Sequence, residues 1–263
     1  MTTNILYATP LITAYCVFVT ALSGLVFGSF CNAWAWRLVH GESITRGRSH
    51  CASCGHTLSA RDLVPLVSYL SLHGKCRYCG APIGKRYPLA EVTLALAFVA
   101  LVLRYGLTLT ALRFLIVAAL LLVASLTDLE SQEIADRLQV MIAAAALLRL
   151  PVEGLAGLKT GVLGAVAVAL PLLLFVLAAD KIMKRETMGG ADIKLFFVLG
   201  LHFSPLLMLM LLIFACFIGI FFALAAQKGR GVAFPFGPAI ALAALMVALF
   251  GDGLLNWYLS LFF

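Results

Sequence analysis

The stretch TLTALRFLIVAALLLVASLT, residues 108–127, is followed directly by Asp128 and decides the fold. A helix rises 1.5 Å per residue, so about 20 apolar residues cross a hydrocarbon core of about 30 Å. Within this stretch Arg113 is the single charged residue. We therefore predict a transmembrane helix over 108–127 that reaches the membrane boundary at an aspartate.

Apolar runs of this kind make up most of the chain. Of its 263 residues, 63% are hydrophobic and 12% are charged, whereas soluble domains carry about 25% charge. A water-soluble core cannot absorb that excess, so the bilayer is the main solvent. The sequence predicts an all-α polytopic membrane protein with about eight transmembrane helices, over residues 11–36, 88–105, 108–127, 138–150, 157–179, 193–201, 205–226 and 238–260.

The basic residues predict the topology. Four polar segments hold fourteen of the nineteen Lys and Arg residues, namely 40–87, 128–137, 181–194 and 227–237. Cytoplasmic loops carry an excess of Lys and Arg, so we expect all four segments in the cytoplasm and both termini outside. This parity requires 193–226 to cross twice, with a break near Gly200. The net charge of +7 then indicates contact with anionic lipid, and we do not expect nucleic-acid binding.

The segment 40–87 is a polar insert between the predicted spans, which divides the chain into a first span at 1–39, the insert, and a membrane domain at 88–263. It contains two C-x2-C pairs separated by twenty-one residues, and a glycine follows each pair: Cys51, Cys54, Cys76 and Cys79, then Gly55 and Gly80. This spacing is typical of a four-thiolate zinc site. Glycine allows a positive φ, which would let backbone N–H groups point at the thiolates.

The alternative for these cysteines is a pair of disulfides, but a cytosolic location keeps thiols reduced. Four protein ligands leave no open position on the metal, so we predict a structural Zn²⁺ that folds the insert. Three further cysteines lie inside apolar runs, where we expect them to pack as small hydrophobic side chains: Cys16, Cys31 and Cys216.

Two aspartates lie at predicted cytoplasmic ends of membrane helices, Asp128 and Asp192. Ionisable groups at such positions are candidates for function, although each could also lie in headgroup water. Two carboxylates at hydrogen-bonding distance share a proton, so one activates water while the other protonates the leaving group. Gly189 and Gly190 precede Asp192 and allow a substrate backbone to approach closely. This combination indicates aspartic-protease chemistry.

The surroundings of the two aspartates suggest two further hypotheses. If Asp128 ends a helix and Asp192 begins one, the helix dipoles favour charge at Asp192 and place the shared proton on Asp128. Three acidic residues follow Asp128 and form a negative patch that could receive a basic peptide: Glu130, Glu133 and Asp136. Two alternatives to a protease remain, a proton- or ion-coupled transporter that uses the aspartate pair, and a membrane zinc protein that uses its insert for docking.

The motifs resemble those of the bacterial type IV prepilin peptidases, a family of membrane aspartic proteases of the GxGD type. The similar stretches are GSFCNAWAWRL at 28–38, the paired CxxC motifs, TDLESQEIADRL at 127–138, GGADIKL at 189–195 and PFGP at 235–238. The resemblance implies Asp128 and Asp192 as the catalytic pair, the four insert cysteines as metal ligands, and a substrate loop with Gly189, Gly190 and Lys194. Three positions depart from the family pattern: Val39, Ala135 and Ala191.

The same resemblance implies the reaction and its location. The substrate would be a prepilin or pseudopilin whose short basic leader is cut at the cytoplasmic face of the bacterial inner membrane. The new N-terminal residue would then be methylated from S-adenosylmethionine. The residues that bind this methyl donor are unknown at this point, because the sequence contains no glycine-rich dinucleotide-binding motif. We expect Ala191 to change the geometry of the loop without removing the chemistry.

Overall fold

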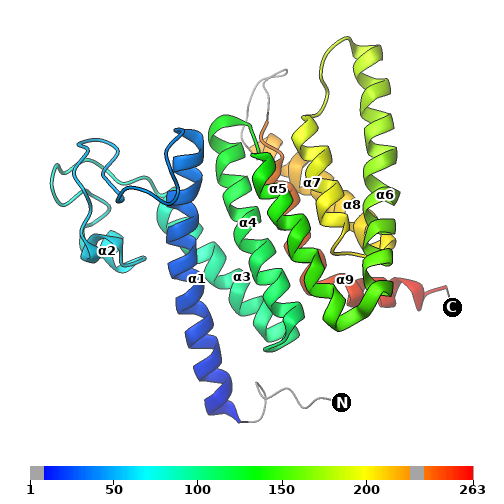
Figure 1. Ribbon diagram of the computed structural model, residues 1–263, viewed down its shortest axis with the longest axis horizontal. Helices are drawn as coiled ribbons and strands as arrows, with labels where there is room; N and C mark the ends of the chain where they lie inside the picture. The colour runs from blue at the N-terminus through cyan, green and yellow to red at the C-terminus, as the bar shows by residue number, and fades with distance from the viewer. Residues whose placement is uncertain (1–8, 226–233, 263) are drawn as a thin grey trace. The chain divides into compact units, whose positions relative to one another are not determined.

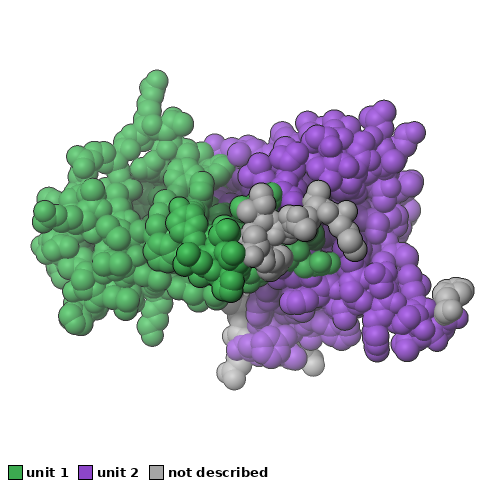
Figure 2. All heavy atoms as spheres, turned by 90° about the horizontal axis from the view of Figure 1, so that it is seen from below, with its two compact units in different colours: residues 1–107 green, residues 108–263 purple. Residues whose placement is uncertain are grey.

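The computed structural model describes residues 9–225 and 234–262, which form helices and turns (Figure 1). Within these ranges there is no β-strand, and two isolated β-bridges join His50 to Thr57 and Lys75 to Pro82. The all-α prediction is therefore confirmed. The chain forms two compact units, unit 1 from Met1 to Leu107 and unit 2 from Thr108 to Phe263 (Figure 2). The predicted loop 227–237 lies mostly outside the described residues.

Unit 1 consists of two long helices and the insert between them. Its helices are α1 (Pro10–Val39), the 3-10 helix η2 (Ala60–Leu63), α2 (Val67–Ser71) and α3 (Arg86–Tyr105). The Nδ2 atom of Asn32 in α1 donates to the carbonyl of Tyr87 in α3 at 3.2 Å, and the rings of Phe27 and Phe98 lie 6.1 Å apart. Because α3 packs on α1, both helices belong to unit 1, which ends at residue 107.

Unit 2 contains the remaining helices. They are α4 (Leu109–Ser131), α5 (Asp136–Ala145), the 3-10 helix η3 (Ala146–Arg149), α6 (Leu150–Met183), α7 (Gly190–Gly200), α8 (Pro205–Ala225) and α9 (Gly237–Leu259). A proline lies in the first turn of α6, α8 and α9, because proline fixes a helical φ and lacks the N–H that a first turn cannot use. Pro205 starts α8 five residues after the last residue of α7, Gly200, which confirms the predicted break near Gly200.

Each of the eight predicted runs folds as a helix, but two of the helices are short. In residues 9–225 and 234–262, six helical segments are long and apolar enough to cross a membrane. The two short helices are α7 and α5. Helix α7 has 11 residues, about half the length that a membrane crossing needs. Helix α5 has 10 residues and joins α6 through η3 in one 48-residue segment with a non-helical Gly154. Two of the eight predicted spans are thus shorter than a full crossing.

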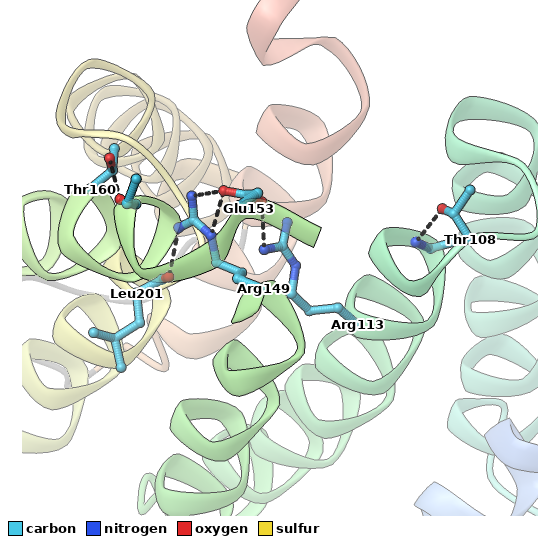
Figure 3. Close-up of polar contacts among 8 residues, drawn as sticks. Thr108, Arg113, Arg149, Glu153, Thr160 and Leu201 are labelled. Carbon is cyan, nitrogen blue, oxygen red and sulfur yellow. Dashed lines mark hydrogen bonds and ion pairs between the residues drawn. The ribbon is translucent and has the colours of Figure 1, made fainter. Parts of the chain in front are cut away.

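At the junction of η3 and α6, two buried arginines share one partly exposed carboxylate (Figure 3). Arg149 Nε donates to Glu153 at 2.9 Å, and Arg113 of α4 reaches the same carboxylate at 3.4 Å. Arg149 also donates to the carbonyl of Leu201 at 2.9 Å, just after α7 ends. Both guanidinium side chains are less than a tenth exposed. The network therefore ties α4 and α6 to the end of α7.

Candidate active site and metal centre

Asp128 lies in the last turn of α4 and is buried, with 5% of its surface exposed. The helix ends three residues later because Gln132 adopts a left-handed conformation with φ of 58°, and its N–H caps the Asp128 carbonyl at 2.9 Å. One oxygen of the side chain accepts a hydrogen bond of 2.7 Å from the backbone N–H of Gly237. Asp128 is thus held at the first residue of α9.

Gly237 contributes to this site in a way that no side chain could replace. A Cβ atom at this position would lie 2.8 Å from Asp128 Oδ2 and 3.2 Å from its Cβ. A helix N-terminus also favours a nearby negative charge. The PFGP motif at 235–238 contains this glycine, but the motif alone does not predict its contact with a residue 109 positions away.

Asp192 lies in the first turn of α7 and is half-buried. Its helix starts at Gly190, and Phe196 one turn later packs against Phe236, with ring centroids 6.3 Å apart. Phe236 is the neighbour of the Gly237 that binds Asp128, so the start of α9 connects the two aspartates. Within the described residues, no basic side chain pairs with either carboxylate.

The environment of Asp192 favours its protonated form. This residue lies outside the six candidate spans, and burial together with the negative charge of Asp128 raises its pKa to about 7. The dipole argument predicted the opposite direction. A helix dipole contributes about 0.3–1 kcal/mol, which is less than one pKa unit, so burial and the second carboxylate outweigh it. The two carboxyl groups therefore titrate as a pair.

The predicted substrate loop is open above its two glycines. Gly189 and Gly190 are exposed, and a Cβ atom on Gly190 would meet nothing within 4 Å. Neither glycine has a positive φ, so the fold alone does not require them. Their small size leaves this part of the surface open, and the binding of a substrate backbone there stays a prediction.

Side chains from α5 hold the same loop. The buried Gln139 donates from its amide to the carbonyl of Ala191 at 3.1 Å, a contact that sequence reasoning missed. Ala191 is the departure from the family motif, and its backbone is fixed by this bond. Lys194 pairs with Asp136 at 2.9 Å, and both side chains are exposed. Lys194 thus offsets part of the charge of Asp136 in the predicted acidic patch, whose other two members, Glu130 and Glu133, are exposed.

The four insert cysteines come together in unit 1. Their sulfur atoms lie within 4.8 Å of one another, and the Sγ atoms of Cys51 and Cys79 are 4.0 Å apart. Tetrahedral zinc with Zn–S bonds of about 2.3 Å needs sulfurs about 3.8 Å apart, so the cluster fits a metal. All seven cysteines are free, which is the state that a metal requires and disulfides exclude.

The two cysteine pairs form matching turns. In the first, Cys51 donates to His56 and accepts from Gly55, and in the second Cys76 donates to Ala81 and accepts from Gly80. The two glycines have φ values of 69° and 72°, as predicted. Hydrogen bonds from the backbone N–H groups of Cys54 and Ser53 lower the pKa of the Cys51 thiol to about 6. The Ala81 N–H lowers the pKa of the Cys79 thiol, but burial and hydrogen bonds with the other thiols outweigh it and raise that pKa to about 11. The thiolate form is therefore favoured at Cys51 first.

Asp62 joins the segment between the two cysteine pairs to the second pair. Its carboxylate accepts hydrogen bonds from Arg77 Nε at 2.8 Å, from the Tyr78 hydroxyl at 3.0 Å and from the Ser59 hydroxyl at 2.7 Å. The guanidinium of Arg77, with the Ser59 hydroxyl, holds the pKa of Asp62 below its usual range. The sequence pattern gave no signal for this contact, because fifteen residues separate Asp62 from Arg77.

Comparison with known proteins identifies the family. The model described as "Bacterial Peptidase A24 N-terminal domain" matches residues 22–105, and that described as "Type IV leader peptidase family" matches residues 115–224. A "Prepilin leader peptidase/N-methyltransferase" of Bacillus subtilis is 32% identical over 245 residues, which cover 90% of this chain and 96% of the relative. The chain belongs to the type IV leader peptidase family.

Two other relatives of the leader peptidase support this assignment. A "Prepilin leader peptidase/N-methyltransferase" of Aeromonas hydrophila is 33% identical and covers 82% of this chain and 76% of its own length. A "Type 4 prepilin-like proteins leader peptide-processing enzyme" of Escherichia coli is 31% identical, with coverage of 86% and 91%. No solved structure matches. The two family matches fall within units 1 and 2 of the leader peptidase, and nothing in them supports a transporter.

Proposed function

We propose that this leader peptidase is an aspartic endopeptidase of the bacterial inner membrane that removes the short basic leader of prepilins or pseudopilins at the cytoplasmic face. The new N-terminal residue is then methylated, with S-adenosylmethionine as the methyl donor. One observation carries the proposal. Asp128 is buried, accepts a hydrogen bond from the Gly237 N–H, and raises the pKa of Asp192 through its negative charge. The names of the relatives support both activities.

The aspartate pair performs the cleavage through one shared proton. The carboxylate that is ionised takes a proton from a water molecule, whose oxygen attacks the scissile carbonyl carbon. The other carboxyl group hydrogen-bonds the carbonyl oxygen, and a proton then passes to the leaving amine as the C–N bond breaks. The Gly237 N–H fixes one oxygen of Asp128. The open surface above Gly189 and Gly190 lets the extended substrate backbone lie beside Asp192.

We assign Zn²⁺ to the four-cysteine cluster as a structural ion. It would hold the two turns of the insert together, since this segment of 48 residues has few large apolar side chains. The exposed Glu130 and Glu133 would attract the basic leader. Reversal of both charges should raise the KM for a leader that contains lysine and lower it for an acidic one.

Incubation of the purified protein in detergent with a prepilin tests the proposal, with cleavage and the mass of the new N-terminus read separately. Asp128→Ala and Asp192→Ala should each abolish cleavage, whereas Asp252→Asn, an exposed aspartate near the end of α9, should not. Cleavage that survives either alanine variant would overturn the catalytic assignment. A cleaved product that never gains the mass of a methyl group would confine the activity to proteolysis.

A further inference from the structure

The middle of the insert is an apolar run, LVPLVSYLSL at residues 63–72, which contains no charged residue. It extends from the end of η2 through α2. Three of its side chains, spaced three residues apart, are between 43% and 69% exposed on unit 1: Val64, Val67 and Leu70. Apolar side chains gain free energy when they leave water, and a cluster of exposed ones marks an interaction surface. A surface outside the insert should therefore cover this run.

The two faces of α2 are reversed relative to those of a helix on a soluble protein. Val67 and Leu70 are three residues apart and lie on one face, which points outward. On the other face, Ser68, Tyr69 and Leu72 line a cavity that the insert forms with α1 and α3. A helix at the surface of a soluble domain turns its polar face to water. The outward face of α2 is the apolar one, as expected for contact with lipid.

A hydrogen bond to α3 sets the depth of α2. The N–H of Leu66, directly before α2, donates to Glu91 Oε2 at 2.9 Å. Glu91 lies five residues after Arg86, the first residue of α3, which is about 7.5 Å along the helix axis. Because α3 has 20 residues, its whole length is needed to cross a hydrocarbon core of about 30 Å. Leu66 is therefore level with the first turns of a membrane span, and Figure 1 shows α2 alongside α1 and not beyond its end.

This depth and the neighbouring charges both match the surface of a bilayer. Helices that lie in the membrane interface bury their apolar face about 5–10 Å into the boundary between headgroups and acyl chains. Arg61 and Lys75, on either side of the run, are exposed, as is Lys85 just before α3. The acid beside the run, Asp62, pairs with Arg77 at 2.8 Å. Basic side chains next to an apolar surface favour the anionic headgroups of the inner leaflet.

We propose that residues 64–70 form an interfacial segment, which inserts into the anionic surface of the membrane that α1 and α3 cross. Val64, Val67 and Leu70 contact acyl chains there, and Arg61 and Lys75 contact anionic headgroups. The insert is then held at both ends by membrane helices and between them by lipid, while its cysteine turns remain in water. This inference is independent of the proposed catalytic function, because it concerns a surface away from the aspartates of unit 2.

Fluorescence quenching of the full-length protein in lipid nanodiscs tests the depth of this segment. The discs contain phosphatidylethanolamine and phosphatidylglycerol, with or without bromine near the headgroup end of the acyl chains. A dansyl-bearing amino acid replaces Val67 or, as the control, Thr57, an exposed residue of the first cysteine turn. Bromine should quench the emission at position 67 at least about twofold, as for a group at the acyl boundary, and leave the emission at position 57 unchanged.

Photo-cross-linking of the unmodified protein checks the same contact without a substitution. A lipid that carries a diazirine near the headgroup end of its acyl chain should label a peptide containing residues 64–70. This measurement keeps the inference testable even where a bulky label at position 67 disturbs the insert.

Two results would overturn the inference. Emission at position 67 that bromine does not change, at the same wavelength as emission at position 57, would place the segment in water. Blue-shifted emission at position 67 without quenching, together with no lipid label in residues 64–70, would show that protein covers this face, either unit 2 or a second copy of the chain. Equal quenching in discs of brominated phosphatidylcholine alone would remove the part assigned to Arg61 and Lys75.

Discussion

Unit 2 buries charged side chains at both ends of its helices, and the two groups differ in how they are paired. Arg113 lies near the start of α4 and Asp128 near its end, about 22 Å apart at 1.5 Å per residue. At the first end, the Glu153 carboxylate contacts two buried arginines. At the other, Asp128 receives one backbone N–H, and neither aspartate has a basic partner within the described residues.

This difference distinguishes charged groups that stabilise the fold from charged groups that act in catalysis. A buried ion pair fixes the elements that it joins, and its loss is costly because it leaves a charge uncompensated. A buried carboxylate pair without a cation has a raised affinity for protons, which a hydrolase can use. We therefore expect substitutions at the arginine end to change stability and substitutions at the aspartate end to change catalysis. Four predictions test that separation.

The largest effect should come from the aspartates. Asp192→Asn keeps the size of the side chain and removes its ability to exchange a proton, so kcat for leader cleavage should fall at least about a thousandfold. The melting temperature should not fall, since no ion pair is lost. Steady-state cleavage and thermal unfolding of the same sample measure both. A stable variant with more than a tenth of the wild-type kcat would contradict the comparison.

The arginine end should show the reverse. Glu153→Ala removes the carboxylate that contacts Arg113 and Arg149, so the free energy of unfolding should fall by about 1–3 kcal/mol, while kcat per folded molecule stays within about twofold. Equilibrium unfolding in mixed detergent micelles gives the first quantity, and active-site titration gives the second. Glu186→Ala, at an exposed loop position, is the control. Equal stability of the two variants would show that the network does not stabilise unit 2.

Gly237→Ala should affect catalysis less than loss of an aspartate does. The added Cβ would lie 2.8 Å from Asp128 Oδ2, so either the carboxylate or the start of α9 must move. We expect kcat to fall about 10- to 100-fold, as the loss of a positioned hydrogen bond at an active site does, with little change in KM. The equivalent change at Gly253, where a Cβ meets nothing within 4 Å, should be silent. A KM effect without a kcat effect would place Gly237 in substrate binding.

The smallest effect should be the dependence on pH. The pKa of Asp192 is raised to about 7, so the pair holds a proton below pH 7 and loses it above. Above pH 7, kcat/KM should fall about tenfold for each unit by which the pH rises. Because the raised pKa belongs to the folded state, its contribution to stability is also lost as the pH rises through 7. Asp192→Asn should flatten the stability profile in this range. An unchanged profile would show that Asp192 does not titrate there.

Much of the site could be predicted from local patterns. The apolar runs predicted eight helices, and the paired cysteines with their glycines predicted the four-cysteine cluster. Both features depend on residues that lie close together in the sequence. Contacts between distant residues were missed. Gly237 binds a carboxylate 109 positions away, and Gln139 reaches a carbonyl 52 positions away. The pairing of Lys194 with Asp136 also weakened a predicted acidic patch that looked complete in the sequence.

The sequence by itself determined the membrane class, the helices and the identity of the two aspartates and four cysteines, since composition and short-range spacing are enough to specify them. The tertiary structure decided which of these groups are paired. Burial and the proximity of Asp128 reversed the direction that a helix dipole alone would give to the pKa of Asp192. Folding of the insert onto α1 and α3 also placed Glu91 in a cavity with aromatic side chains. Electrostatic effects depend on distances through space, and those distances exist only after the helices have packed.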